Sequence, residues 1–301
     1  MFLHIFSTVL LPIVLVAGAG YVLGRHGRLD PSPLARVTFY LFNPCLVFTA
    51  LANSSVTPDL LGRLALLKLL TYVLMVPLTR GLAARASLPA TASSAFVLAT
   101  AFANSGNYGM SVNEYAFGAD GLALAALCYV TDNLMLNSLG VFIAARGRAS
   151  AWQSLAQVLR NPALYAVPLG IILQQTGWSL PLPLARALEL SGRAAVPTMQ
   201  VVLGMQLAAL PLDPRHWRLI GIATSLRLIV SPLIALALAS LLGLTGLTRQ
   251  VGVLQSAVPT AVMASIIASR YNTEPNLVAG AVLVSSLTSL LTVTALLSWL
   301  H

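Results

Sequence analysis

A short polar run interrupts an apolar part of the chain at Ala101–Met110, with the sequence AFANSGNYGM. Its carboxamides at Asn104 and Asn107 and its hydroxyl at Ser105 can donate hydrogen bonds to a negatively charged group. Gly106 and the second glycine of the run loosen the helix. A break here would expose the N-terminus of a half-helix, whose free N–H groups and positive dipole end favour an anion. Small polar residues also pack membrane helices together, but their density in this run favours a binding site.

A second interruption lies at AVPTA, Ala257–Ala261. Pro259 removes a helical hydrogen bond there, and Thr260 adds a hydroxyl. In lipid, an unpaired backbone group costs several kcal/mol, so such breaks persist only where protein or a water-filled cavity satisfies them. We therefore expect both interruptions to meet at one buried site.

Ionisable side chains inside apolar segments are functional candidates. Lys68, Asp132 and Arg227 are of this kind. Lys68 and Asp132 form a structural pair, or else Lys68 or Arg227 is the counter-charge for a substrate carboxylate and Asp132 a protonatable or charge-relay group. Lys68 and Asp132 are the better coupling candidates, and Arg227, which stays charged, is the better fixed anion anchor. Further polar candidates on the segment of Asp132 and just after the first break are Thr131, Asn133, Asn137 and, as a further coupling candidate, Glu114.

The composition indicates that membrane-spanning helices hold these side chains in place. The 301-residue chain is 57% hydrophobic and 8% charged, against about 25% charged residues in a typical soluble domain. Apolar stretches near the length that crosses a bilayer recur throughout. Proline, glycine and charge divide them into ten expected spans: 5–24, 34–52, 60–83, 91–117, 121–144, 161–176, 186–209, 216–242, 250–270 and 277–299.

Arginines gather at alternate ends of these spans, which places both termini outside under the positive-inside rule. The 16 arginines and one lysine are scattered rather than clustered, so no nucleic-acid surface is indicated. Both cysteines lie inside apolar segments, and no metal- or cofactor-binding pattern is present, so we expect no cofactor. The lipid bilayer is the expected surrounding.

An internal repeat runs through the chain at an offset of about 150 residues. PLAR at Pro33–Arg36 recurs at Pro183–Arg186, and further prolines and glycines match in order. We expect residues 1–145 to form a first five-helix repeat, residues 146–160 a cytoplasmic linker, and residues 161–301 a second repeat. Because five is odd, the second copy must be inverted, which is the architecture of many secondary transporters.

The runs FNPCLVFTAL at Phe42–Leu51, FANSGNYGM at Phe102–Met110 and AVPTA resemble the auxin efflux carrier family. That family includes plant PIN carriers and bacterial malonate or malate permeases. The resemblance implies a fold similar to bile-acid sodium symporters: all-α, ten transmembrane helices in two inverted repeats, with helices 4 and 9 crossing as broken helices. It adds Asn43 and Pro44 to the candidate substrate-binding residues, and it implies a homodimer in a bacterial-type inner membrane.

Other functions are disfavoured. The four histidines lie at span ends or termini, and there is no HExxH pattern, so no intramembrane hydrolase is indicated. We therefore expect a secondary carrier, not an enzyme, for a small organic anion. It would work by alternating access, proton-coupled or uncoupled; a sodium-coupled symporter and an anion channel remain the alternatives.

Overall fold

The structure of the protein is a computed structural model that describes residues 1–146, 158–211 and 213–300. Most of the expected cytoplasmic linker, at 147–157, lies outside these residues. The described residues form helices and no β-strand, apart from a single antiparallel bridge between Ala103 and Thr260. The expectation of an all-α membrane protein is confirmed at this level.

The first part of the chain forms helices that follow the expected spans closely. Their bounds are α1 (Phe2–Ile5), η1 (Phe6–Leu10), α2 (Leu11–Arg25), α3 (Ser32–Val37), η2 (Thr38–Phe42), α4 (Asn43–Ala52), α5 (Pro58–Arg85), α6 (Ala90–Ala101), η3 (Ser105–Met110), α7 (Ser111–Met135), η4 (Leu136–Gly140) and α8 (Val141–Ala144). The elements η1 to η4 are short π-helical stretches inside longer helices. Gly118 has a positive φ of 68°, so it turns the chain between the expected fourth and fifth spans.

The rest of the chain follows the same alternation. The bounds are α10 (Ala163–Thr176), α11 (Leu182–Arg193), α12 (Ala195–Ala209), η5 (Pro214–His216), α13 (Trp217–Ser225), η6 (Leu226–Val230), α14 (Ser231–Leu241), α15 (Gly246–Ala257), α16 (Val262–Arg270) and α17 (Pro275–Leu300). The expected seventh span is thus α11 followed directly by α12, and the expected ninth is α15 and α16 with four residues between them.

Within the described residues, six helical stretches are long and apolar enough to cross a bilayer. They are Phe2–Arg25, Ser32–Ala52, Pro58–Arg85, Ser105–Ala144, Trp217–Leu241 and Pro275–Leu300. The shorter helices Ala90–Ala101 and Ala163–Thr176 are also apolar. Many large apolar side chains on these helices face outward, as expected where lipid rather than water surrounds the protein. The chain is an integral membrane protein.

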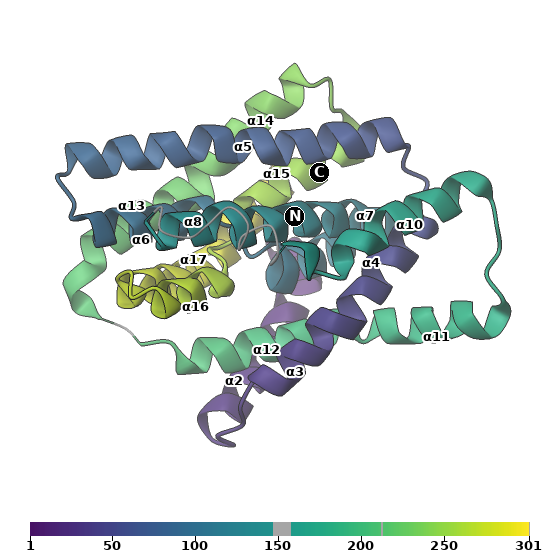
Figure 1. Ribbon diagram of the computed structural model, residues 1–301, viewed down its shortest axis with the longest axis horizontal. Coiled ribbons are helices and arrows are strands. Elements are labelled where there is room, and N and C mark those ends of the chain that lie inside the picture. The colour runs from purple at the N-terminus through teal and green to yellow at the C-terminus, as the bar shows by residue number, and fades with distance from the viewer. Residues whose placement is uncertain (147–157, 212, 301) are drawn as a thin grey trace.

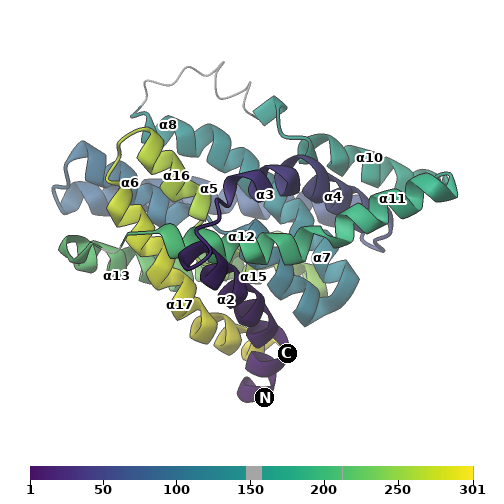
Figure 2. The same ribbon diagram turned by 90° about the horizontal axis from the view of Figure 1, so that it is seen from below.

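Two tight helix pairs form one side of the molecule (Figures 1 and 2). α2 runs against α12, and α4 runs against α10 and α11. A Cβ atom built on Gly20 would lie 2.2 Å from the Val201 carbonyl oxygen, and one on Gly204 would lie 1.8 Å from the Ala17 carbonyl oxygen. Only glycine allows α2 and α12 to approach this closely, so this pair is packed backbone against backbone.

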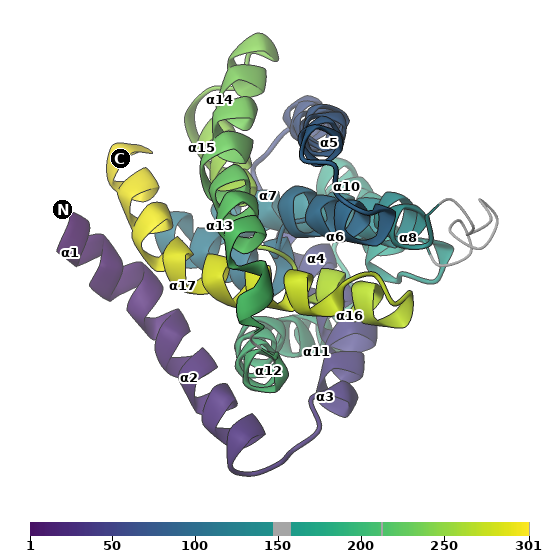
Figure 3. The ribbon, with the colours of Figure 1, turned by 90° about the vertical axis from the view of Figure 1, so that its left-hand side faces the viewer.

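The other helices pack beside these pairs, with α5 and α14 farthest away in Figure 3. The breaks between α6 and η3 and between α15 and α16 lie in the interior, where Asn104 and Thr260 are buried. The two chain ends lie close together in Figures 2 and 3, where α1 contacts α17. This arrangement brings the two interrupted segments of the sequence together.

Candidate functional site

The two interruptions pair with each other through their backbones. Between α6 and η3 the chain is extended at Phe102, and between α15 and α16 it is extended at Val258 and Ala261. The Asn104 N–H donates to the Pro259 carbonyl at 2.8 Å, and the Ala261 N–H donates to the Phe102 carbonyl at 3.0 Å. Each break therefore supplies the partners that the other break lacks, as a low-dielectric interior requires.

Three side chains bind the carbonyl groups at the ends of the half-helices α6 and α15. Arg227, which is 1% exposed, donates from Nε to the Val258 carbonyl at 3.1 Å and from Nη1 to the Ala101 carbonyl at 3.0 Å. Its Nη2 donates to the Ser256 carbonyl. Thr260 Oγ1 donates to the Ala99 carbonyl at 2.7 Å, and Lys68 Nζ to the Gln255 carbonyl at 3.3 Å. The charges of Arg227 and Lys68 also complement the negative C-terminal ends of both half-helices.

The first break starts earlier than the glycines suggest. It spans Phe102–Asn104, and Gly106 lies within the helix that follows. A Cβ atom on Gly106 would lie 2.8 Å from the Tyr129 ring, and one on Gly109 would lie 2.3 Å from Gln255 Oε1. Both glycines lie in this π-helical stretch rather than in the break itself, and the absence of a Cβ at Gly106 allows close packing against the Tyr129 ring.

A cavity of about 290 Å³ opens beside the first break. Its walls come from α3, η2 and α4, from the residues around η3, from α7 and η4, from α12, and from the start of α16. The lining includes Asn43, Asn104, Ser105, Gly106, Asn107, Tyr129, Asp132, Asn133, Asn137 and Gln206. A cavity of this size accommodates a small organic molecule.

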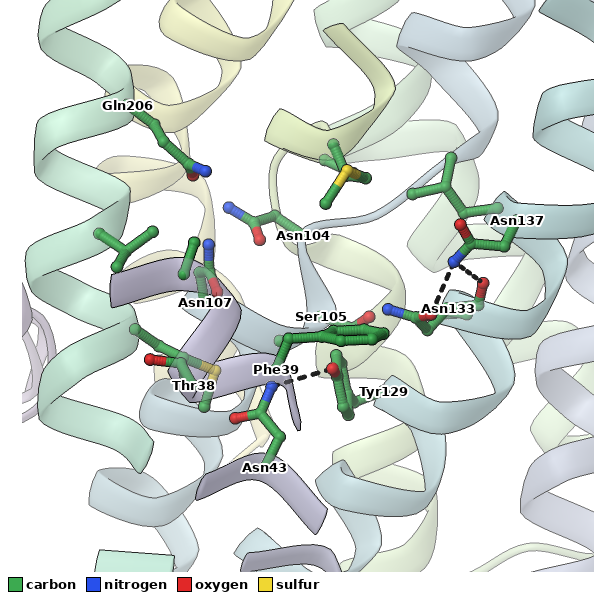
Figure 4. A pocket seen from close by; sticks show the side chains of 18 of the residues that line it. Thr38, Phe39, Asn43, Asn104, Ser105, Asn107, Tyr129, Asn133, Asn137 and Gln206 are labelled. Carbon is green, nitrogen blue, oxygen red and sulfur yellow. Dashed lines mark hydrogen bonds between the residues drawn. The ribbon is translucent and has the colours of Figure 1, made fainter. Parts of the chain in front are cut away.

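Hydrogen-bond donors converge on this cavity. Figure 4 shows the carboxamides of Asn104, Asn107 and Gln206 directed into the same space. Asn104 is 6% exposed, and its Nδ2 has no hydrogen-bond partner among the described residues. η3 continues into α7 and begins at Ser105, so its first N–H groups have no acceptor within the helix. Amide and helix N-terminal N–H donors of this kind are suited to a negatively charged oxygen.

The opposite wall holds a second group of amides. Asn43 Nδ2 donates to the Tyr129 hydroxyl at 2.9 Å, while Asn43 Oδ1 has no partner among the described residues (Figure 4). Asn137 Nδ2 donates to Asn133 Oδ1 at 2.7 Å, and Asn161 Nδ2 donates to the same oxygen at 3.1 Å. This fixes the Asn133 carboxamide at the cavity wall.

A buried ion pair lies next to the cavity. Lys68 Nζ lies 3.0 Å from Asp132 Oδ2, and the two side chains are 2% and 3% exposed. The Tyr72 hydroxyl donates to Asp132 Oδ1 at 2.9 Å. Asp132 also lines the cavity, so one carboxylate connects the cavity wall to Lys68, which in turn binds the end of α15.

Comparison with known proteins identifies the family. The family model described as membrane transport protein matches residues 5–297. The chain belongs to this family. It is similar to an uncharacterized transporter of Methanothermobacter thermautotrophicus, with 32% identity over 292 residues that cover 94% of each chain.

Plant members of the membrane transport protein family are also similar over part of the chain. Probable auxin efflux carrier component 1b of Oryza sativa subsp. japonica is 29% identical over 147 residues, which are 46% of this chain and 26% of that protein. Auxin efflux carrier component 1 of Arabidopsis thaliana is 27% identical over 147 residues, 46% of this chain and 23% of that protein. The resemblance to the auxin efflux carrier family is thus confirmed.

Not every predicted site residue of this family member reaches the cavity. Asn43, Asn104, Ser105, Gly106, Asn107, Asp132, Asn133 and Asn137 line it. The Thr131 hydroxyl instead donates to the Leu127 carbonyl of its own helix, and Thr260 and Arg227 bind backbone carbonyls of the breaks. Pro259 accepts the Asn104 N–H, and Pro44 lies in the first turn of α4. Glu114 lines a different cavity, and Lys68 lies behind Asp132.

Sequence reasoning missed several residues of the site. Tyr129, Gln206, Thr38 and Phe39 line the cavity, and Tyr72 binds Asp132. Gln200, on α12, contacts the helix that follows the first break. A glutamine inside an apolar span is itself a signal, because a buried carboxamide needs a partner. Gln200 and Gln206 could have been found in this way.

Proposed function

We propose that the protein is a secondary transporter that moves a small organic anion, a carboxylate, across the membrane by alternating access. The observation that carries this proposal is the buried Asn104 Nδ2, which lies at the cavity without a partner among the described residues. An unpaired buried donor is costly unless a ligand or water completes it. The neighbouring N-terminus of η3 favours negative charge on that ligand.

Two inverted five-helix halves are part of the proposal, with both termini outside a bacterial-type inner membrane. An offset of 150 residues exchanges the first span with the sixth and the second with the seventh. The contact of α2 with α12 is then the image of the contact of α10 with α4, and both contacts are extensive. This correspondence supports a twofold relation between the halves.

We propose that Asp132 and Lys68 couple a proton to transport. Asp132 is within reach of a ligand in the cavity, and its protonation would release Lys68 from the ion pair. Lys68 and Arg227 already bind carbonyl oxygens at the ends of the half-helices, which are the oxygen ligands that a sodium ion would need. Two resident cations therefore favour protons or no ion over sodium.

The first test measures anion binding to the purified protein in detergent through the change in its thermal unfolding temperature. Malate, malonate, succinate, indole-3-acetate and taurocholate are compared at two pH values, with and without sodium. We expect one class of carboxylate to raise the unfolding temperature, without a sodium requirement. Asn107→Ala and Lys68→Ala should each abolish this rise. Stabilisation that is unchanged in both variants would place the site elsewhere.

Transport is tested separately in proteoliposomes with the carboxylate that binds. A carrier shows uptake that saturates with concentration, and it is accelerated when the same anion is loaded on the far side. An anion channel, the alternative from a different class, shows neither property. Uptake that follows an imposed pH gradient and is lost in Asp132→Asn supports proton coupling.

A further inference from the structure

A second cavity, of about 430 Å³, lies next to the first and takes part in no step described above. It is bounded by α2, α4, α7, α11 and α12. Its polar lining includes Thr49, Asn53, Glu114 and the ion pair of Glu189 with Arg193. No hydrogen bond or ion pair of the Glu114 carboxylate is found among the described residues, so this group is free to face the cavity.

The same three segments line both cavities in succession. On α4, Asn43 lines the first cavity and Leu46 the second. On α12, Met199, Val202 and Gln206 line the first cavity, whereas Val196, Pro197 and Gln200 line the second from another face of the helix. A helix rises about 1.5 Å per residue, so the three-residue step on α4 separates the two linings by about 4.5 Å along that helix. The two cavities therefore adjoin each other across α12 and are separated by a thin layer of side chains.

The chain after the first break also lines the first cavity and then the second. Asn107 lines the first cavity, and Glu114, two turns later, lines the second. Between them lies Ser111, which is fully buried. The layer between the cavities therefore crosses η3 and α7 at Ser111 and crosses α12 next to Met199.

Gln200 lies in this layer and lines the second cavity. It is 2% exposed, and its Nε2 donates both to the Asn107 carbonyl and to Ser111 Oγ. Its Oε1 has no partner among the described residues. One carboxamide thus joins α12 to the helix that begins at the candidate anion site, at the level where the cavity lining changes.

We infer that the second cavity is the other arm of the translocation path and that Gln200 is the latch between the two arms. This inference rests on the proposed function as a transporter. The bonds that Gln200 makes are neutral hydrogen bonds, whose net contribution is small because water replaces them when they open. They can therefore hold the layer closed in one conformation and open in another. The two arms open to opposite faces of the membrane.

The test uses cysteine reporters and a small membrane-impermeant thiol reagent, a sulfonated methanethiosulfonate. Cys45 and Cys128 are first replaced by alanine. Val202→Cys then reports on the first cavity and Ala50→Cys on the second. Labelling is compared in intact cells and in inside-out vesicles. We expect each reporter to react from one face only, and the two faces to be opposite.

The latch is tested by adding Gln200→Leu, which keeps the size of the side chain and removes its donors. We expect the Val202→Cys reporter to become reactive from the second face, with a labelling rate about tenfold above background, because two neutral hydrogen bonds are lost. Gln175→Leu is the matched control: it is the same change on α10, at an exposed side chain that lines neither cavity. It should leave the sidedness of labelling unchanged.

A second variant tests the latch independently if Gln200→Leu folds poorly. Ser111→Ala removes one acceptor of the latch and should give a smaller increase in the same direction. If both reporters react from the same face, the second cavity is not the other arm. If neither latch variant changes the sidedness of Val202→Cys labelling, Gln200 is not the latch.

This measurement needs no anion, so its result is separate from that of the binding experiment. If the two reporters are labelled from opposite faces but no carboxylate binds, the translocation path is supported and the proposed substrate class is overturned. Carboxylate binding with both reporters reactive from one face would keep the proposed function and remove the second cavity from the path.

Discussion

The two helix breaks use the same backbone arrangement for different purposes. Each lies between two half-helices, and each completes the other through the pairing of Asn104 with Pro259 and of Ala261 with Phe102. The first break directs Asn104, Ser105 and the N-terminus of η3 into the cavity. The second directs Thr260 back onto the Ala99 carbonyl and contributes the apolar Ala261 and Met263 to the cavity wall.

We propose that the first break binds the anion and that the second break supports the fold around it. The polar first break leaves a donor without a partner, as a binding site does before its ligand arrives. In the second break, both the hydroxyl and the N–H of Thr260 have partners, the N–H donating to Ser285 Oγ at 3.0 Å. Substitutions in the second break should therefore change stability, and polar substitutions in the first should change binding.

The largest expected effect comes from Arg227, which supports both breaks at once. Arg227→Met removes the charged donors that bind Ala101 and Val258 and leaves several buried carbonyls unpaired. We expect the free energy of unfolding to fall by at least about 3 kcal/mol, since hydrogen bonds to charged groups contribute about 1.5–3 kcal/mol each. The measurement is unfolding of the purified protein in detergent.

The control is Arg218→Met, at an exposed position one helix earlier in the chain, in α13. This change should have a small effect, because a surface substitution away from special contacts stays within about 0.5 kcal/mol. Equal effects of the two substitutions would show that Arg227 does not hold the breaks.

Gly106→Ala acts on the packing behind the first break. The added Cβ would lie 2.8 Å from the ring of Tyr129, whose hydroxyl accepts from Asn43. We expect a loss of about 1–3 kcal/mol in stability from overpacking, together with weaker anion binding as the Asn43 wall moves. Thermal unfolding with and without the carboxylate measures both effects.

Gly62→Ala is the matched control, because nothing lies within 4 Å of a Cβ at this position of α5. It should be neutral or stabilising by up to about 1 kcal/mol, as alanine favours the helix over glycine. A Gly106→Ala variant as stable as Gly62→Ala would contradict the close packing described here.

Thr260→Val tests the supporting role of the second break. The valine keeps the shape and loses the bond to the Ala99 carbonyl, so stability should fall by about 1 kcal/mol. Anion binding should be retained. Thr176→Val, at an exposed hydroxyl that bonds within its own helix, provides the comparison and should have almost no effect. Loss of binding in Thr260→Val without loss of stability would reverse the roles of the two breaks.

Much of the helical framework could be predicted because it follows from local composition. Apolar stretches bounded by proline, glycine and charge predicted helices near their observed positions, such as 60–83 for α5 (Pro58–Arg85). The sequence also allowed Lys68 to pair with Asp132, as it does, because buried opposite charges stabilise each other; their role in coupling stays a proposal. The division of the chain into two repeats and a linker stays a prediction.

The details of the site could not be predicted because they depend on contacts between distant segments. Arg227 was expected to face an anion, yet it binds the ends of α6 and α15, which only the folded chain brings together. The role of Gly106 depends on Tyr129, a residue on a different helix. The sequence singled out the polar run, several of whose residues line the cavity, but it could not show which of them do so.

The most direct test of the comparison between the two breaks is anion binding to Asn104→Asp. This change keeps the shape, replaces the unpaired Nδ2 donor with an acceptor, and adds a negative charge at the cavity. Thermal stabilisation by the carboxylate that binds the unmodified protein is measured in Asn104→Asp, in Thr260→Val and in Asn272→Asp, a loop control outside the cavity. The expected result is that Asn104→Asp alone loses the stabilisation. Full stabilisation of Asn104→Asp would contradict the assignment of the first break as the binding site.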